Sequence, residues 1–390
     1  MSPEIASEEQ DMIVIVGAGL AGASAATELR ERGHDGPVTL IGAEEHAPYE
    51  RPPLSKGFLL GDQPFEKAFV HELDWYAAND IDLRLGTRVT AIDPAARSVR
   101  LRPVVGGEEE ELSYAALLLA TGAQPRHLAV ADRAGPPVIC LRTVEDSRAL
   151  KETLKEGTRV AIVGAGWIGL EVAAAARKAG SEVTVFETAD LPLLRVLGPE
   201  VATLFADLHR AHGVDLRLGT SVRSDDLTDA DLIVVGVGAI PDTVLAEQAG
   251  LDVDNGVLVD ATLRTSDPHI FAIGDIANQD HPTLGRRIRV EHWDTAIEQA
   301  KVAAHNLAGG SQEYARIPYF FTDQYDLGME YFGSVGPEGY DRVDIEGSTD
   351  VAAGDAFRAY WVKDGTVVAA MHANDWDATD TIRASIGTPR

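Results

Sequence analysis

The feature that most constrains this chain of 390 residues is a strand–turn–helix–strand unit that occurs twice. The first copy begins with a short apolar run (12–16, MIVIV) and a glycine-rich turn (17–22, GAGLAG). An alanine-rich stretch of helical composition (23–32) and a second apolar run (38–41, VTLI) complete it. The same order of parts returns within 159–186. A chain with two such units is expected to form two α/β domains, each around a parallel sheet.

The second copy consists of a strand (159–163, RVAIV), a turn (164–169, GAGWIG), a helix (170–178) and a strand (183–186, VTVF). In such turns the first glycine permits a tight bend, the second lets a pyrophosphate approach the backbone, and the third lets helix and strand pack closely. The helix N-terminus adds unpaired N–H groups and a partial positive charge. One glycine motif is weak evidence. Two copies, each between a strand and a helix, predict two Rossmann-like dinucleotide-binding domains.

A carboxylate after the second strand of each unit is expected to accept a hydrogen bond from a ribose hydroxyl. In the second copy this residue is Glu187, and the next three residues (188–190, TAD) contain no arginine to bind a 2′-phosphate, so NADH is expected rather than NADPH. In the first copy Glu44 is favoured, although Glu45 is an alternative and either carboxylate can be plain surface charge.

Composition restricts the chemistry further. The net charge of -28 disfavours nucleic acid and anionic membranes as partners, because both bind positive surfaces. The single cysteine, Cys140, cannot form a disulfide or a redox pair, so electron chemistry requires a bound organic cofactor. The polar start, Met1–Asp11, does not resemble a signal peptide and no run is long enough to span a membrane, which makes the cytoplasm the expected location. His209 and His212, three residues apart, lack further ligands and are interpreted as surface residues, so no metal is expected.

Two dinucleotide sites in one chain suggest a tightly held flavin and an exchangeable nicotinamide. Two other apolar strands end in polar turns, 117–123 (LLLATGA) and 270–275 (IFAIGD), and the proline-rich segment 48–56 (PYERPPLSK) carries two cations. Flavin reduction places negative charge on the ring, so a fixed cation nearby favours the reduced form, and Lys56 is the candidate. Arg51 either contacts a phosphate or caps a loop.

With these segments the chain resembles the FAD-dependent, NADH-oxidising ferredoxin reductases of oxygenase systems, the putidaredoxin-reductase and biphenyl-dioxygenase-reductase type. The similarity extends over nearly the whole chain and rests on GAGLAG, PYERPPLSK, LLLATGAQPR, GAGWIGLEVA, VGVGAIPDT, LRTSDPHIFAIGDIA, VEHWDTA and IPYFFTDQYD. It implies a glutathione-reductase-like α/β fold with a small α+β C-terminal domain. The implied domains are an FAD-binding domain (1–124 and 241–316), an NAD-binding domain (125–240) and a C-terminal domain (317–390).

The resemblance also implies residue roles. Lys56 lies at the flavin ring, and Trp293 lies close to it. Glu171 lies beside the nicotinamide carboxamide and pairs with Lys56, although the helix dipole alone favours a carboxylate in the first turn of a helix. The implied FAD-binding residues are Gly17, Gly19, Leu20, Ala21, Gly22, Glu44, Arg51, Lys56, Ala120, Thr121, Gly122, Gly274, Asp275, Glu291, His292 and Trp293. The implied NADH-binding residues are Gly164, Gly166, Trp167, Ile168, Gly169, Glu171, Glu187 and Gly238.

The expected activity is hydride transfer from NADH to FAD, followed by release of single electrons to a ferredoxin-type iron–sulfur protein. The aromatic run 319–321 resembles a tryptophan-rich stretch that packs at the flavin in relatives, but it contains no tryptophan here, which puts an electron-exit role in doubt. Arg286, Arg287 and Arg289, with Arg51, form the expected docking patch for an acidic partner. Alternatives are a rubredoxin reductase, an NADH oxidase, or a flavoprotein that acts through its interactions as apoptosis-inducing-factor-like proteins do.

Overall fold

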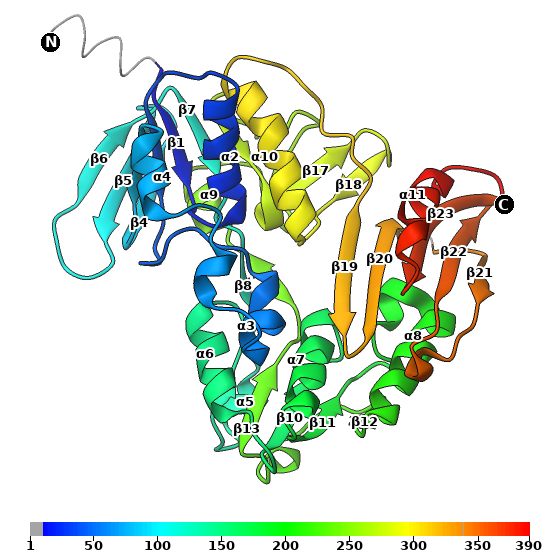
Figure 1. Cartoon of the computed structure of the whole chain (residues 1–390). Coiled ribbons are helices and arrows are strands. Elements are labelled where there is room, and N and C mark those ends of the chain that lie inside the picture. Colours follow the sequence, from blue (N-terminus) through cyan, green and yellow to red (C-terminus); the bar gives the residue numbers. More distant parts are fainter. Residues whose placement is uncertain (1–10, 338) are drawn as a thin grey trace, which may run out of the picture. The chain divides into compact units, whose positions relative to one another are not determined.

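The computed structural model describes residues 11–337 and 339–390, which form two compact units (Figure 1). Unit 1 combines the described part of Met1–Glu50 with Phe65–Gln124 and Ile240–Ile317. Unit 2 combines Arg51–Pro64, Pro125–Ala239 and Pro318–Arg390. The interpretation of the N-terminal segment as unlike a signal peptide concerns residues that, apart from Asp11, lie outside the described part.

Unit 1 is built on a parallel five-stranded sheet in the order β16-β7-β1-β2-β3. Its strands are short and almost wholly apolar, as expected for a parallel sheet that is covered on both faces. In register, Ile13 lies opposite Val38 on one side and Ala116 on the other. The strands are β1 (Ile13–Val16), β2 (Val38–Ile41), β3 (Ile81–Arg84), β7 (Ala116–Leu119) and β16 (Ile270–Ala272).

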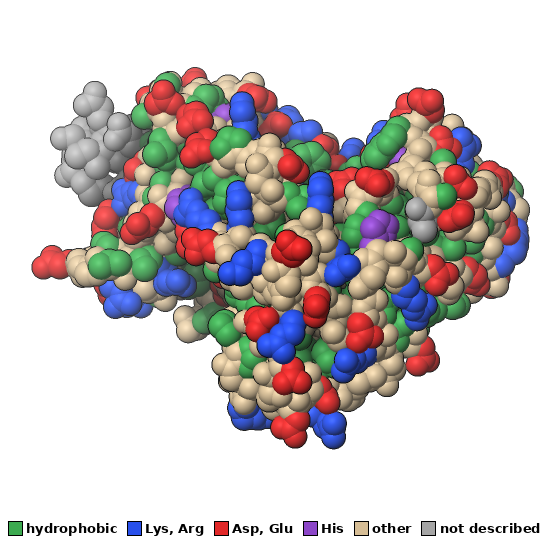
Figure 2. Space-filling view, turned by 60° about the horizontal axis from the view of Figure 1, so that its bottom comes forward, with side chains coloured by type: hydrophobic (Ala, Val, Ile, Leu, Met, Phe, Trp, Pro, Cys, Tyr) green, Lys and Arg blue, Asp and Glu red, His purple; other side chains and the backbone are tan. Residues whose placement is uncertain are grey.

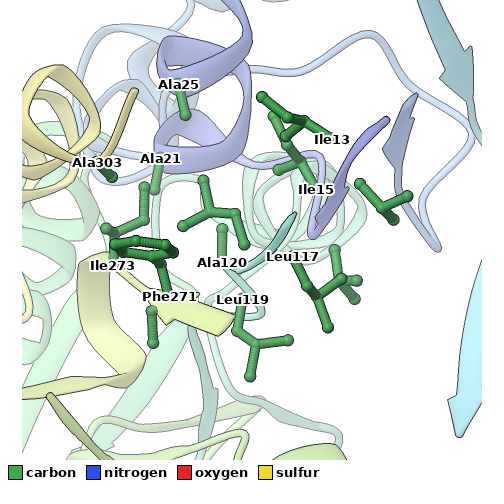
Figure 3. Packing of buried hydrophobic residues seen from close by; sticks show 14 of the residues in the cluster. Ile13, Ile15, Ala21, Ala25, Leu117, Leu119, Ala120, Phe271, Ile273 and Ala303 are labelled. Atoms are coloured by element: carbon green, nitrogen blue, oxygen red, sulfur yellow. The ribbon is translucent and has the colours of Figure 1, made fainter. Parts of the chain in front are cut away.

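Two helices pack side by side in unit 1, α2 (Leu20–Glu31) and α10 (Trp293–Leu307) (Figure 1). Small side chains such as Ala25 and Ala303 lie in the resulting core next to Phe271 and the strand residues (Figure 3). Because the alanine side chain is small, these helices approach the sheet and each other closely while still burying apolar surface. This packing fixes the N-terminus of α2 within the first glycine-rich turn, directly after Gly19.

Unit 1 also contains two small sheets, two short α-helices and the 3-10 turns Phe65–Ala68 and Gly274–Ile276. One sheet is antiparallel, and the other pairs β15 with β17 in parallel and β17 with β18 antiparallel. Their elements are β4 (Thr87–Asp93), β5 (Ser98–Pro103), β6 (Glu110–Ser113), β15 (Val257–Val259), β17 (Ala277–His281), β18 (Arg286–Ile288), α4 (Leu73–Ala78) and α9 (Val244–Gln248). Two of the passages of the chain between the units lie in the short strands β8 (Ala123–Pro125) and β14 (Ala239–Pro241), and the others follow Glu50, Pro64 and Ile317.

Unit 2 contains a second parallel five-stranded sheet, in the order β12-β11-β10-β13-β9. Apart from the outer strands β16 and β9, this order repeats that of unit 1: β13-β10-β11-β12 corresponds to β7-β1-β2-β3. The strands are β9 (Val138–Ile139), β10 (Arg159–Val163), β11 (Glu182–Phe186), β12 (Asp215–Arg217) and β13 (Leu232–Val235). The helices are α3 (Gly57–Leu60), α5 (Ala129–Asp132), α6 (Val144–Thr153), α7 (Trp167–Lys178) and α8 (Leu194–Ala211), which is interrupted at Gly198.

The C-terminal part of unit 2 is an antiparallel sheet in the order β19-β20-β23-β22-β21, followed by helix α11 (Thr379–Ser385). Its strands are β19 (Tyr319–Gln324), β20 (Leu327–Gly333), β21 (Arg342–Gly347), β22 (Phe357–Lys363) and β23 (Thr366–Ala373). Trp361 is fully buried and donates its indole N–H to the Leu197 carbonyl oxygen at 3.0 Å, next to the break in α8. The C-terminal sheet and the second glycine-turn copy therefore share one core.

The predicted fold class is confirmed: the chain has two Rossmann-like parallel sheets and a further C-terminal α+β part. The compact units differ from the expected domain limits in that Arg51–Pro64 and the C-terminal part group with the second copy. Acidic and basic side chains are interspersed over the face of the molecule in Figure 2. Within the described residues, no helix combines the length and apolar character that crossing a bilayer requires.

Candidate functional site

The glycine-rich turn of unit 1 contains two kinds of glycine, which differ in the space available for a Cβ atom. A Cβ on Gly17, whose φ is +114°, would lie 2.2 Å from the Ala120 carbonyl oxygen, and one on Gly22 would lie 2.0 Å from the Gly17 oxygen. These two positions are glycine because the protein's own backbone occupies the space. At Gly19 no atom of the described residues, apart from its two chain neighbours, lies within 4 Å of the added carbon. Packing does not explain the middle glycine, so the open space is suited to an approaching ligand.

Unit 2 repeats this division. Cβ atoms on Gly164 and Gly169 would lie 2.4 Å and 2.1 Å from the carbonyl oxygens of Gly236 and Gly164, whereas at Gly166 the nearest atom is 3.9 Å away. Helices α2 and α7 begin directly after Gly19 and Gly166, and no described side chain caps either helix. Their first N–H groups are therefore left for a phosphate. Both cradles fit a dinucleotide pyrophosphate.

Both helices begin three residues earlier than the sequence suggested, at Leu20 and Trp167 rather than at residues 23 and 170. The third glycine of each motif lies inside the first turn, where close contact with the preceding strand requires it. Glu171 is consequently the fifth residue of α7, beyond the first turn. The expectation that it lies in the first turn is wrong, and the helix dipole, which acts within that turn, does not explain a carboxylate there.

The two carboxylates expected to contact ribose lie where parallel strands end. Glu187 follows β11, and its carboxylate accepts from the backbone N–H groups of Ala165, at 2.8 Å, and Ala189, at 2.9 Å. Its charge therefore lies at the glycine-rich turn itself. Glu44 follows β2 and is half-buried, and its carboxylate accepts from the Tyr49 hydroxyl at 2.5 Å. The alternative, Glu45, is exposed.

The other residues expected around FAD in unit 1 follow β7, which pairs with β1, and β16, which pairs with β7. Ala120, Thr121 and Gly122 come directly after β7, and the Thr121 hydroxyl donates to the Asp242 carbonyl oxygen at 2.9 Å. Gly274 and the half-buried Asp275 follow β16, and the Gly274 N–H donates to the Gln299 side chain at 2.8 Å. Because the carboxyl ends of parallel strands share one edge of the sheet, these turns lie together with Gly17–Gly22.

The start of α10 carries the segment Glu291-His292-Trp293. His292 is the N-cap of the helix and its Nδ1 accepts from the Asp294 N–H at 3.2 Å, while Trp293 is the first helical residue. Burial raises the pKa of Glu50, and a contact with the Trp293 side chain acts in the opposite direction. Glu50 belongs to the motif PYERPPLSK, but the sequence pattern did not predict its contact with Trp293.

Arg287 and Arg289, proposed for partner docking, bond within unit 1. Arg287 donates to the carbonyl oxygens of Val259 and Asn278 at 3.1 and 2.9 Å. Arg289 donates to the Asp275 carbonyl oxygen at 2.9 Å and pairs with Glu291 at 2.5 Å. Both side chains therefore have hydrogen-bond acceptors within unit 1, and their role in docking a partner protein stays a prediction.

In unit 2, the proline-rich segment brings Lys56 to α7. The Lys56 ammonium lies 2.8 Å from the Glu171 carboxylate and 5.4 Å from the centre of the Phe321 ring. The side chain of Glu171 is 4% exposed and that of Lys56 is 19% exposed. The Arg51 guanidinium donates to the carbonyl oxygen of Arg142 in a loop, and its contact with a phosphate stays a prediction.

Two hydroxyl groups that the sequence did not single out complete the surroundings of Glu171. Ser55 donates to its Oε2 at 2.5 Å and Thr322 donates to its Oε1 at 2.6 Å, and both side chains are buried. Ser55 directly precedes Lys56 and Thr322 lies in β19, after the aromatic run. The carboxylate is thus held by three donors from two segments outside its own helix.

The aromatic run Tyr319-Phe320-Phe321 lies in β19. Phe320 packs on Trp167, with ring centres 4.4 Å apart, and Tyr319 packs on Phe332, with ring centres 4.9 Å apart. Trp167, a residue of the expected NADH site, therefore packs on β19. Ile168, from the same expected site, is exposed. Gly238 adopts a φ of +100°, which favours glycine.

The interpretation of His209 as a surface residue is wrong. Its side chain is completely buried in α8, with Nε2 2.8 Å from Gln324 Oε1 and Nδ1 3.3 Å from the Tyr325 hydroxyl. Burial lowers the pKa of His209 to about 4, with the nearby His212 acting in the same direction and the bond to Gln324 against it. His212 stacks on Tyr325 with ring centres 3.7 Å apart. Across residues 11–337 and 339–390, no three His, Cys, Asp or Glu side chains converge as metal ligands.

These features define the class first: an α/β protein with two dinucleotide cradles of the same design. Residues 11–300 match the family model described as pyridine nucleotide-disulphide oxidoreductase. The chain belongs to this family of oxidoreductases, as its resemblance to ferredoxin reductases predicted.

Similar proteins cover nearly the full length of the chain. The ferredoxin–NAD(+) reductase component of an anthranilate 1,2-dioxygenase system from Burkholderia cepacia is 43% identical, over 93% of this chain and 91% of the relative. A rubredoxin–NAD(+) reductase from Pseudomonas putida is 37% identical, over 85% of this chain and 88% of the relative. A putidaredoxin reductase, solved in a covalent complex with putidaredoxin, has a TM-score of 0.89 at 37% identity, covering 97% of this chain and 94% of that one.

Proposed function

We propose that this chain is an FAD-dependent reductase that takes hydride from NADH and passes single electrons to a ferredoxin-type iron–sulfur protein. The observation that carries the proposal is the pair between Lys56 of the proline-rich segment and Glu171, 2.8 Å apart, in which Glu171 lies on the helix that follows the second dinucleotide cradle. When bound, the flavin would accept the electron pair of one hydride and release it as single electrons. The protein supplies two phosphate cradles and fixed charges.

Unit 1 is the proposed FAD unit. Its space above Gly19 and the uncapped N-terminus of α2 would accept the pyrophosphate, and Glu44 would accept from the ribose. The turns after β7 and β16 and the start of α10 would surround the rest of the molecule. The residues of unit 1 assigned to this role are Gly17, Gly19, Leu20, Ala21, Gly22, Glu44, Ala120, Thr121, Gly122, Gly274, Asp275, Glu291, His292 and Trp293. The family resemblance adds Arg51 and Lys56 to this prediction.

The second cradle is the proposed NADH site. Gly166 leaves space for the pyrophosphate, and Glu187 would accept from the adenosine ribose while repelling a 2′-phosphate. Glu171 would orient the nicotinamide carboxamide, and Lys56 would neutralise the buried carboxylate and favour a reduced flavin. No general base is required, because position and field are what the protein contributes.

The acceptor is proposed from the relatives, whose names include reductases of ferredoxin, putidaredoxin and rubredoxin. The ferredoxin reductase component is 43% identical and the rubredoxin reductase 37% identical, which favours a ferredoxin over a rubredoxin. The single cysteine rules out a disulfide relay within the chain. A cytoplasmic location remains a proposal that follows from dependence on NADH.

The test is rapid-mixing reduction of the FAD-loaded protein with NADH and NADPH, followed by a panel of ferredoxins and rubredoxins with cytochrome reduction as the readout. We expect bleaching of the flavin by NADH in preference to NADPH and electron delivery to a ferredoxin. A protein that takes up no FAD would sink the proposal. Stoichiometric peroxide with no ferredoxin reduction would make it an oxidase, and a long-lived nicotinamide–flavin complex with slow turnover would make it a signalling flavoprotein.

A further inference from the structure

The carboxylate of Glu171 accepts two hydrogen bonds in addition to its ion pair with Lys56. Oε1 receives the Thr322 hydroxyl at 2.6 Å as well as the Lys56 ammonium at 2.8 Å, and Oε2 receives the Ser55 hydroxyl at 2.5 Å. Because Glu171 is 4% exposed, water contributes little to holding it. A buried carboxylate is stable only when its oxygens are satisfied by donors, and each of these three contacts has the length of a charge-assisted bond.

Behind Thr322 lies a further set of buried polar side chains that the proposed chemistry does not use. Gln324, on the same strand, places its Nε2 3.3 Å from the Thr322 hydroxyl, and its Oε1 lies 2.8 Å from Nε2 of His209. The Tyr325 hydroxyl lies 3.3 Å from the other nitrogen of that imidazole. The side chains of Thr322, Gln324 and His209 are 0%, 1% and 0% exposed.

The proton positions in this set follow from elementary rules. The Gln324 oxygen can only accept, so His209 carries its proton on Nε2 and donates it. The imidazole is neutral at ordinary pH, since burial lowers its pKa to about 4, and its Nδ1 therefore accepts from Tyr325. The Gln324 amide donates to the Thr322 oxygen, which leaves the Thr322 proton for Glu171. Each group in this chain of hydrogen bonds, from Tyr325 to Thr322, therefore donates to the next group in the direction of the Glu171 carboxylate.

We propose that Thr322, supported by Gln324 and His209, is a positioning residue that fixes the Glu171 carboxylate for nicotinamide binding. The inference rests on the proposed function, in which Glu171 meets the nicotinamide carboxamide. A carboxylate held at both oxygens has one orientation, whereas without the Thr322 proton Oε1 keeps only the ammonium of a flexible lysine. The hydrogen-bond chain stops the threonine hydroxyl from rotating, because its oxygen already accepts from Gln324.

The experiment compares Thr322→Val with Thr322→Ser in the FAD-loaded protein. Valine keeps the volume and removes the hydroxyl, and serine restores it. The readout is equilibrium binding of NAD⁺ to the oxidised protein, followed by the change in the flavin spectrum, with KM and kcat for NADH measured alongside. We expect T322V to weaken NAD⁺ binding about tenfold, the value for one charge-assisted hydrogen bond, and T322S to bind within about twofold of the parent protein.

A matched control and a second variant keep the test decisive. Thr158 is a buried threonine of the same unit whose hydroxyl donates to the Thr153 carbonyl oxygen at 3.1 Å, away from Glu171, so T158V should bind NAD⁺ as the parent does. Gln324→Met removes the donor behind Thr322 and should weaken binding about threefold, even if T322V fails to fold.

Unchanged NAD⁺ binding in T322V, no recovery in T322S, or an equal loss in T158V would each overturn the inference. The proposed function fails separately, through a parent protein that takes up no FAD or is not reduced by NADH.

Discussion

The buried imidazole of His209 predicts a specific loss of stability in acid. Burial lowers its pKa to about 4, whereas an unfolded histidine titrates near 6.5. Below pH 6.5 the unfolded chain takes up a proton that the folded protein refuses, so this contribution is intact at neutral pH and is lost progressively toward pH 4. Between pH 7.5 and 5.0 the loss is about 2 kcal/mol.

Replacing His209 by glutamine removes this titration while keeping an amide donor near the position of Nε2. We expect the H209Q protein to be less stable than the parent at pH 7.5, because it loses the contact with Tyr325, and to lose less on acidification. The other groups titrate in both proteins, so the difference between the two pH responses isolates His209. For a domain of this size, about 2 kcal/mol corresponds to roughly 4–8 °C in melting temperature.

The assay is thermal unfolding of the FAD-loaded proteins at pH 7.5 and 5.0, followed by tryptophan fluorescence. His127→Gln is the control, since this imidazole is exposed in the same unit and the variant should keep the parent's acid response. An H209Q protein that loses as many degrees as the parent between the two pH values would refute the reasoning.

Two further outcomes are expected from the dinucleotide cradles. Glu187→Gln removes the charge that would repel a 2′-phosphate and should raise the NADPH-to-NADH ratio of kcat/KM about tenfold, measured by steady-state kinetics; an unchanged ratio would mean that Glu187 does not face the adenosine ribose. Gly22→Ala should lower the stability of the FAD-free protein by about 1–3 kcal/mol, since the new carbon would lie 2.0 Å from a backbone oxygen, whereas Gly19→Ala should melt like the parent yet retain less FAD, measured by flavin absorbance. Equal melting temperatures for the two glycine variants would contradict the distinction between packing and ligand glycines.

Much of the fold was predictable because its strongest signals are local. The strand limits at Val38–Ile41 and Arg159–Val163 agree with the sequence pattern residue for residue, since short runs rich in β-branched residues and bounded by glycine leave little freedom. The two helix starts were less accessible. A glycine inside a first helical turn looks like part of the preceding loop unless its contact with the strand backbone is known.

The surroundings of Glu171 were only partly predictable. The pair with Lys56 was expected from the family resemblance, and the structure places these two side chains together. Ser55 and Thr322 carried no motif of their own, because single hydroxyl residues are common and their contacts depend on how distant segments meet. The burial of His209 had a usable signal: it lies four residues after Phe205 on the apolar face of α8, next to Leu208.

The three donors to Glu171 come from positions far apart in the chain, 116 residues before it for Ser55 and 151 after it for Thr322. A protein engineer who transplants only the second glycine-turn copy into another scaffold would move the acid and leave its hydroxyls behind. The recipient would gain a coenzyme cradle containing an uncompensated negative charge. Exchange of coenzyme domains among such enzymes therefore has to include the proline-rich segment and the first strand of the C-terminal sheet.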